Sequence, residues 1–222
     1  MLNRYRGVEV CKADIKEFVN LVREDRVNIP NNDLVSIAKC MLFIKKMYAF
    51  PETRREHYYN CLVTDMFNLI HSFNKDSLRV YYTFFRSTIE NLVRVVLGYE
   101  NTNATGVRNM FKELRDRYEK AEKEFIDYLE GEYGKCCEVI HSNYNVNLTM
   151  YQYYEGIKKT DELDKEQLLK LSKQLVTFYR LCKQFLVKCN HEQINDVFHN
   201  QKEVLGFLLG KKDYECYLNY NE

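Results

Sequence analysis

Residues 77–99 read SLRVYYTFFRSTIENLVRVVLGY, and they show the clearest helical pattern in the chain. Their large apolar residues recur three and four positions apart, as on one face of an α-helix: Leu78, Tyr81, Tyr82, Phe85, Ile89, Leu92, Val93 and Val96. Asp76 or Ser77 is placed to cap the start, and Gly98 or the asparagine-rich 101–103 to end it. So wide a stripe predicts a central helix over about 77–98 that packs on several neighbours.

The same spacing predicts helices on both sides of the central one. We expect helices over 11–26, 51–73, 107–130, 135–145, 164–189 and 195–209, of which 107–130 is long and charged. A further helix is expected to end at residue 48 and to begin at 31–33, which supply its N-cap residues. Gly131 and Gly134 are expected to interrupt the chain after the charged helix. Residues 145–163 lack a regular pattern and predict an irregular loop, and the last twelve residues are polar and tyrosine-rich.

The composition favours the same fold class. Among 222 residues there are only 8 Gly and 2 Pro, against a usual share of about 12% for the two together. Turns are therefore few, which argues against a many-stranded β-sandwich or barrel. A chain of this length buries roughly 70% of its unfolded surface as one domain. We predict an all-α fold in which residues 1–222 form a single domain, one bundle of about eight helices.

Charge and hydropathy exclude several kinds of partner. Lys and Arg total 33 and Asp and Glu total 32, so no overall basic field attracts nucleic acid, although a local basic face remains compatible with this balance. The start of the chain has no apolar core of the kind that a signal peptide needs. No stretch reaches the ~18 uncharged residues of a membrane span. We expect a cytoplasmic protein that does not contact a membrane.

The cysteines and histidines show no metal-binding spacing. The 8 cysteines lie mostly inside predicted helices, and without a secretion signal they are expected to be reduced thiols that pack as small apolar groups. There is no C-x-x-C pair, and the 5 histidines lack the spacing of zinc ligands. Phosphate-binding loops, nucleophile elbows and H-E-x-x-H motifs are missing too. We expect neither a metal nor a cofactor.

Arg86 and Glu90 are charged residues at the border of the central apolar stripe. Because they lie four positions apart on one helix face, we expect them to form a partly buried ion pair. One interpretation is a structural pair that fixes the helix register. The other is a guanidinium that Glu90 orients toward a phosphate.

His141 follows Cys137 by four positions and shares its predicted helix face. One interpretation is a core histidine that a backbone carbonyl satisfies. The other is a general acid or base, because imidazole titrates near neutral pH. Asn143 belongs to a group of serine and asparagine residues after His141 that are placed to orient the ring or a ligand.

Arg79, Arg86 and Arg94 alternate with Tyr82 and other aromatic residues. Basic residues among aromatic ones can bind single-stranded nucleic acid through phosphate contacts and base stacking. An ordinary amphipathic helix gives the same pattern. Downstream, the tyrosines at 151, 153 and 154 suit either a partner surface or core packing.

Residues 77–145 resemble bacterial abortive-infection proteins of the HEPN-like group. The resemblance rests on Arg86 and Glu90 in FFRSTIENL and on His141 in CCEVIHSN. It implies an all-α bundle, often a dimer, that cuts RNA or accompanies a nucleotidyltransferase or another defence partner. Nuclease members of the group carry an arginine and, about one and a half turns later, a histidine on the same helix. No arginine here has a histidine at that spacing, and Lys135 before His141 lacks the bidentate guanidinium.

Three functional hypotheses follow. The first is a metal-independent endoribonuclease of a bacterial antiviral defence or toxin–antitoxin system. His141 would be the general acid/base, Arg86 would stabilise the phosphorane and Glu90 would hold Arg86, with RNA bound by Arg79, Tyr82, Arg94 and Asn143. The second is a non-catalytic helical interaction module, such as an antitoxin, immunity protein or defence-complex subunit, that binds a protein partner. The third is a small-ligand sensor with a pocket between helices. A homodimer is compatible with each.

Overall fold

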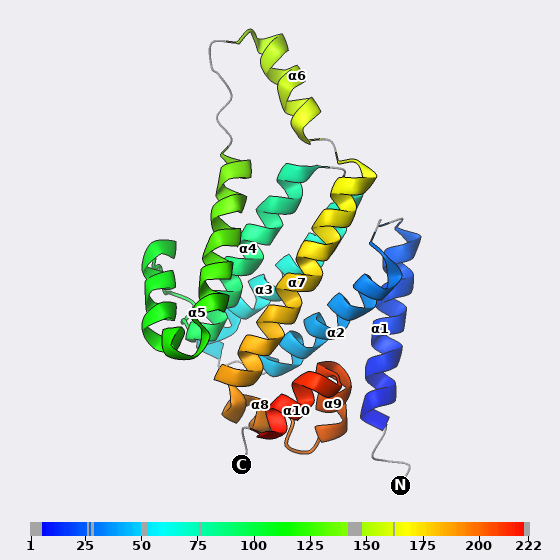
Figure 1. Cartoon of the computed structure of the whole chain (residues 1–222), viewed down its shortest axis with the longest axis vertical. Coiled ribbons are helices and arrows are strands. Elements are labelled where there is room, and N and C mark those ends of the chain that lie inside the picture. The colour runs from blue at the N-terminus through cyan, green and yellow to red at the C-terminus, as the bar shows by residue number, and fades with distance from the viewer. Residues whose placement is uncertain are drawn as a thin grey trace. The chain divides into compact units, whose positions relative to one another are not determined.

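The structure is a computed structural model that describes residues 6–25, 27, 29–49, 53–75, 77–141, 148–161 and 163–219. The described residues form an all-α fold without a β-strand (Figure 1). The helices are α1 (Arg6–Glu24), α2 (Asn31–Met47), η1 (Thr53–Arg55), α3 (Glu56–His71), η2 (Ser72–Asn74), α4 (Leu78–Leu97), α5 (Val107–Ile140), α6 (Met150–Asp161), α7 (Lys165–Cys189), α8 (His191–Val197), α9 (Lys202–Leu209) and α10 (Lys211–Asn219), where η marks a 3₁₀ helix. The predicted fold class is confirmed, with more helices than the eight expected.

The chain divides into two compact units. One is Pro51–Leu168, and the other combines the two ends of the chain, Met1–Phe50 and Leu169–Glu222. Each unit has its own buried apolar residues. This division does not test whether residues 1–222 are a single domain, which stays a prediction.

The central helix α4 has the caps that its sequence predicts. Ser77 Oγ accepts a hydrogen bond from Val80 N at 3.2 Å. Gly98 ends the helix with φ 70, a left-handed conformation that glycine adopts without steric cost. Tyr81, Phe85 and several other members of the apolar stripe are buried, and α4 packs against both α3 and α5 within its unit. The helix predicted over about 77–98 is confirmed.

Helix α5 bends sharply at Glu122, where φ is −143 and ψ is 38. Its second half runs back beside the first, so α5 is a helical hairpin (Figure 1). Arg115 on the first half bridges to the second, with Nη1 2.7 Å from Asp127 Oδ1 and Nη2 in contact with Glu130. The fold-back allows both halves to bury their apolar residues, such as Leu114 and Phe125.

The interruption expected at Gly131 and Gly134 is wrong. Both glycines lie inside the second half of α5, and residues 135–140 of the short helix predicted over 135–145 are the end of the same helix. Residues 142–145 lie outside the described part of the chain. Glycine lowers helix stability by only about 1 kcal/mol relative to alanine, and the apolar residues packed on either side outweigh it. The break falls at Glu122 instead, in a charged stretch between two apolar clusters.

The irregular loop expected over about 145–163 is also wrong in part, because residues 150–161 form α6. A capping box begins this helix: Gln152 N donates to Thr149 Oγ1 at 3.3 Å, and Thr149 N donates to Gln152 Oε1 at 3.1 Å. Asp164 and Gln167 form the same motif at the start of α7, which agrees with the predicted start of this helix at residue 164. Residues 145–147 and 162 lie outside the described part of the chain.

In the unit formed by the chain ends, α1, α2 and α9 pack on one another. Asp33, expected among the N-cap residues of α2, lies instead within the first turn, and Pro30 is the N-cap. The Asp33 carboxylate reaches α7, where it accepts from Lys173 Nζ at 2.8 Å and from Ser172 Oγ at 3.0 Å. The helix predicted over 195–209 is two helices, α8 and α9, and the last residues add α10.

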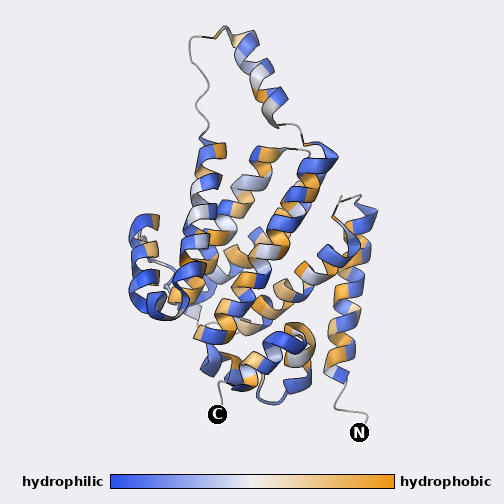
Figure 2. Ribbon diagram, viewed as in Figure 1, coloured by the Kyte–Doolittle hydropathy of each residue, from blue (hydrophilic) through white to orange (hydrophobic). Residues whose placement is uncertain are grey.

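Figure 2 shows hydrophobic and hydrophilic residues alternating along the long helices, the pattern of amphipathic helices that bury one side. Over the part of the chain that the structure describes, none of the helices has the length and apolar character needed to cross a membrane.

Candidate functional site

Arg86 lies half-buried on α4 and faces the second half of α5. Its Nε donates to the Tyr133 hydroxyl at 3.0 Å, and its Cζ lies 5.3 Å from the centre of the same ring. Burial alone would lower the pKa of Arg86, but the hydrogen bond and nearby negative charge leave this pKa raised, so the guanidinium stays charged. Its two terminal nitrogens donate to no described residue, which leaves them able to bind an oxyanion.

Glu90 pairs with Arg94 and not with Arg86. The distance from Arg94 Nη2 to Glu90 Oε1 is 2.9 Å. The ion pair predicted between Arg86 and Glu90 is therefore wrong. Two physical reasons favour the observed partner: an acidic residue four positions before a basic one is the better orientation on a helix, and Tyr133 already holds Arg86.

Arg94 is buried and contacts other residues of the protein. Besides Glu90, it donates from Nη2 to the Thr105 carbonyl at 3.1 Å, and its Cζ lies 5.0 Å from the centre of the Tyr58 ring. Arg94 Nη1 is buried without a hydrogen-bond partner among the described residues. Such an arginine joins α3, α4 and the loop before α5. The endoribonuclease hypothesis requires Arg94 to be exposed to RNA, but Arg94 is buried in this position.

His141 is exposed at the end of α5, where its backbone N donates to the Cys137 carbonyl at 2.9 Å. The interpretation as a core histidine is therefore wrong. The face of α5 that leads to His141 carries Tyr133, which accepts a hydrogen bond from Arg86, and Cys137, which interacts with Arg86 electrostatically. Asn143, expected to orient the ring or a ligand, lies outside the described residues.

Arg79 and Tyr82 are both half-exposed on α4. The Tyr82 ring meets the Tyr81 ring edge to face, with centres 5.2 Å apart. Of the residues predicted to form one site, Arg79, Tyr82, Arg86, Glu90 and Arg94 thus share a helix but have different surroundings.

Two polar contacts near the candidate site were not predicted from the sequence. One is the Arg86–Tyr133 contact, which joins residues 47 positions apart and has no local signal. The other centres on Asp65 of α3, whose Oδ2 accepts from Ser87 Oγ at 2.6 Å and from Asn91 Nδ2 at 2.7 Å. The four-residue spacing of Ser87 and Asn91 on α4 is the signal that could have shown a polar partner on a neighbouring helix.

All 8 cysteines are free thiols. Cys11, Cys40, Cys136 and Cys182 are buried, as expected for small apolar side chains. Burial raises the pKa of Cys40 to about 11 and that of Cys136 to about 12, so both are protonated and unreactive at neutral pH. Within the described ranges, no group of three or more His, Cys, Asp and Glu side chains is placed to hold a metal ion.

Comparisons of the chain with protein-family models, with curated proteins and with solved structures give no match. The resemblance of residues 77–145 to the HEPN-like group stays a prediction.

Proposed function

We propose that this protein is a non-catalytic helical module that binds a protein partner, and that α6 carries the contact surface. One observation carries the proposal. Three large side chains of α6 are mostly exposed: Met150 at 90%, Tyr151 at 73% and Tyr154 at 66%. Large apolar and aromatic side chains that cluster on a surface are typical of sites where another protein binds.

The spacing of these side chains suits a helix that inserts into a groove. Met150 and Tyr154 are four positions apart and Tyr151 and Tyr154 three, so all three project from neighbouring parts of one face. Tyrosine brings a large apolar ring with a hydroxyl that can donate a hydrogen bond at the rim. Tyrosine is also among the residue types that contribute most of the binding energy at protein interfaces.

The charge of α6 adds a second feature of the partner. Lys158 follows Tyr154 by four positions and is exposed, so it extends the same face with a positive charge. Lys159 is held by Glu155, with Nζ 3.3 Å from Oε1. We therefore expect the partner to present an apolar groove with an acidic group at one end, which fits an antitoxin-, immunity- or defence-complex type of assembly.

The surroundings of the predicted catalytic residues also favour binding over catalysis. The endoribonuclease hypothesis needs Glu90 to hold Arg86 and Arg94 to reach RNA. Glu90 and Arg94 are paired with each other, and Arg94 is buried.

The test is co-purification of the whole protein with the products of the genes on either side of its own, followed by titration. Wild type should bind one of these products. The double variant Tyr151→Ser/Tyr154→Ser should weaken binding at least tenfold, about 1.4 kcal/mol. A matched control, Leu21→Ser/Leu218→Ser, removes two other exposed apolar side chains and should leave the affinity unchanged.

Two outcomes would overturn the proposal. One is a double variant that binds as tightly as wild type. The other is a failure of every neighbouring product to bind. If analytical ultracentrifugation shows a dimer that the double variant abolishes, the occupant of the α6 surface is a second copy of this chain, and the proposal of a different partner is wrong.

A second candidate function is RNA cleavage, favoured by the unbonded terminal nitrogens of Arg86 beside Tyr133. In this mechanism His141 takes the proton of the 2′-hydroxyl, whose oxygen bonds to phosphorus, and Arg86 stabilises the negative charge on the phosphorane. The bond from phosphorus to the 5′-oxygen then breaks, and this oxygen takes a proton from water, which leaves a 2′,3′-cyclic phosphate and a 5′-hydroxyl. RNA cleavage and growth inhibition by wild type and by His141→Ala test it. Equal activity of the two proteins would remove His141 from the mechanism.

A further inference from the structure

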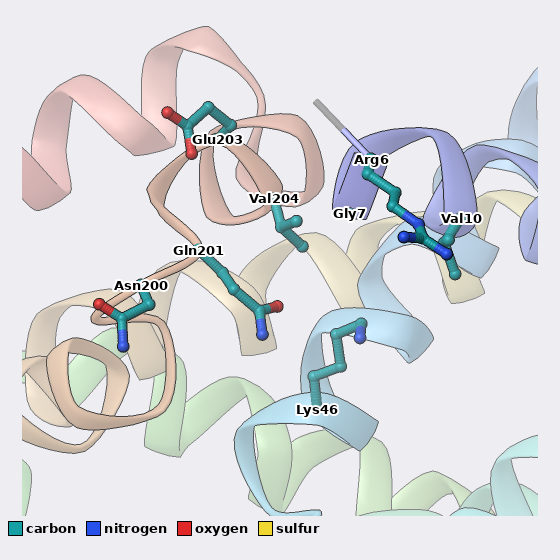
Figure 3. A pocket seen from close by; sticks show the side chains of 8 residues that line it. All are labelled: Arg6, Gly7, Val10, Lys46, Asn200, Gln201, Glu203 and Val204. Atoms are coloured by element: carbon teal, nitrogen blue, oxygen red, sulfur yellow. The ribbon is translucent and has the colours of Figure 1, made fainter. Parts of the chain in front are cut away.

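A pocket of about 410 Å³ lies within the unit formed by the two chain ends. It opens among the start of α1, the end of α2 and the start of α9 (Figure 3). Its lining includes Arg6, Val10, Lys46, Gln201, Glu203 and Val204. A volume of this size is within the range of small-molecule sites, about 300–1,000 Å³.

The charge of the pocket is mainly positive. The side chains of Arg6 and Lys46 make no hydrogen bond or ion pair with a described residue, so both cations can bind a ligand. Figure 3 shows Lys46 between the Gln201 amide and the Arg6 guanidinium, while the Glu203 carboxylate points away from them. Two cations that form no ion pair within the described part of the chain favour an anion.

Part of the pocket wall is apolar, beside its charged and polar side chains. Val204, which is buried, points into the pocket (Figure 3), and Val10 also lines it. Helices α1 and α9 approach closely here, since a Cβ added at Gly7 would lie 2.8 Å from Val204 Cγ2. A wall built on packed helices can hold the apolar part of a ligand without a large rearrangement.

The side chain of Gln201 adds a neutral polar group to the pocket. Gln201 is the N-cap of α9 but makes no side-chain cap hydrogen bond. Its amide can therefore donate to a ligand oxygen or accept from a ligand hydroxyl.

We propose that this pocket binds a small organic phosphate, with the phosphate between Arg6 and Lys46 and the apolar part against Val10 and Val204. A guanidinium presents two parallel donors that match two phosphate oxygens, and an ammonium adds a compact second charge. A dianion also balances the two cations. This site is separate from the α6 surface, and its test does not depend on a protein partner.

The experiment is a calorimetric titration of the full chain with phenyl phosphate, inorganic phosphate and benzoate as three separate probes. Phenyl phosphate should bind saturably and more tightly than either of the other two. Lys46→Gln and Arg6→Gln should each weaken its binding at least tenfold. The control Lys16→Gln removes an exposed cation of α1 away from the pocket and should change the affinity less than twofold. Circular dichroism establishes that each variant is folded.

Several results would overturn the inference. They are a failure of phenyl phosphate to bind, an equal loss of affinity in Lys16→Gln, and unchanged affinity in both pocket variants. Benzoate binding as tight as that of phenyl phosphate would contradict the phosphate assignment. Inorganic phosphate binding as tight as that of phenyl phosphate would contradict the role of the valine wall.

Discussion

Replacing Arg94 with methionine tests whether this residue is part of the fold, as its contacts indicate. The variant Arg94→Met keeps a long side chain with an apolar stem but removes the donors that reach Glu90 at 2.9 Å and the Thr105 carbonyl at 3.1 Å. Removing one partner of a buried ion pair costs about 3–5 kcal/mol. The Glu90 side chain is 27% exposed, so water partly solvates it and the lower end, about 3 kcal/mol, applies.

Two smaller terms act in opposite directions. Loss of the contact between Arg94 and the Tyr58 ring costs about 1 kcal/mol. Removal of the buried, unpartnered Nη1 returns about 1 kcal/mol. They cancel, and the expected decrease in the free energy of unfolding stays near 3 kcal/mol.

Urea unfolding followed by far-ultraviolet circular dichroism measures this change. The control Arg108→Met replaces an exposed arginine of α5 and should lie within about 0.5 kcal/mol of wild type. Glu90→Gln combined with Arg94→Met should be less destabilising than the two single changes added together, by at least about 1 kcal/mol. A decrease below about 1 kcal/mol for Arg94→Met, or strict additivity with Glu90→Gln, would refute the reasoning.

Three further predictions concern packing and pH. Gly131→Ala should raise the free energy of unfolding by about 1 kcal/mol, because Gly131 is helical and a Cβ there meets no atom within 4 Å; an unchanged or lower value would show that the glycine is required. Gly7→Ala should instead destabilise the protein in the same urea assay, because its Cβ would lie 2.8 Å from the buried Val204 Cγ2; a gain equal to that of Gly131→Ala would contradict the close helix approach. Burial raises the pKa of the Cys136 thiol from 9.0 to about 12, so the contribution of this thiol to stability is full below pH 9 and is lost as the pH rises from 9 to 12. Melting temperatures across this range should therefore fall more steeply for wild type than for Cys136→Ala. At pH 8, iodoacetamide should label the exposed Cys216 well before Cys136.

Local sequence signals predict the central helix well because its determinants are local. The apolar spacing of residues 78–97, the Ser77 cap and the left-handed Gly98 all act within a few positions of one another. The capping box at Thr149 and Gln152 is equally local and was visible in the sequence, so α6 could have been predicted from it.

The hairpin in α5 depends on contacts that no local pattern contains. Its fold-back at Glu122 is stabilised by Arg115 reaching residues 12 and 15 positions away. Glycines at 131 and 134 weaken a helix locally, but the packing of neighbouring apolar residues decides the outcome.

The candidate site shows the same limit. Glu90 has an arginine four positions away on either side. The better orientation of Glu90 before Arg94 is worth only about 0.2–0.5 kcal/mol, which is too little to decide the partner. The choice depends on Tyr133, which comes from another helix and engages Arg86. A prediction of the observed pairing therefore needs the tertiary structure.

Amide hydrogen–deuterium exchange of the whole protein, with and without its co-purified partner, tests the central claim most directly. We predict that the partner slows exchange in residues 150–161, while the residues around Arg86 and Tyr133 keep their rates. Unchanged exchange in α6, or slowing confined to α4 and the second half of α5, would contradict the account.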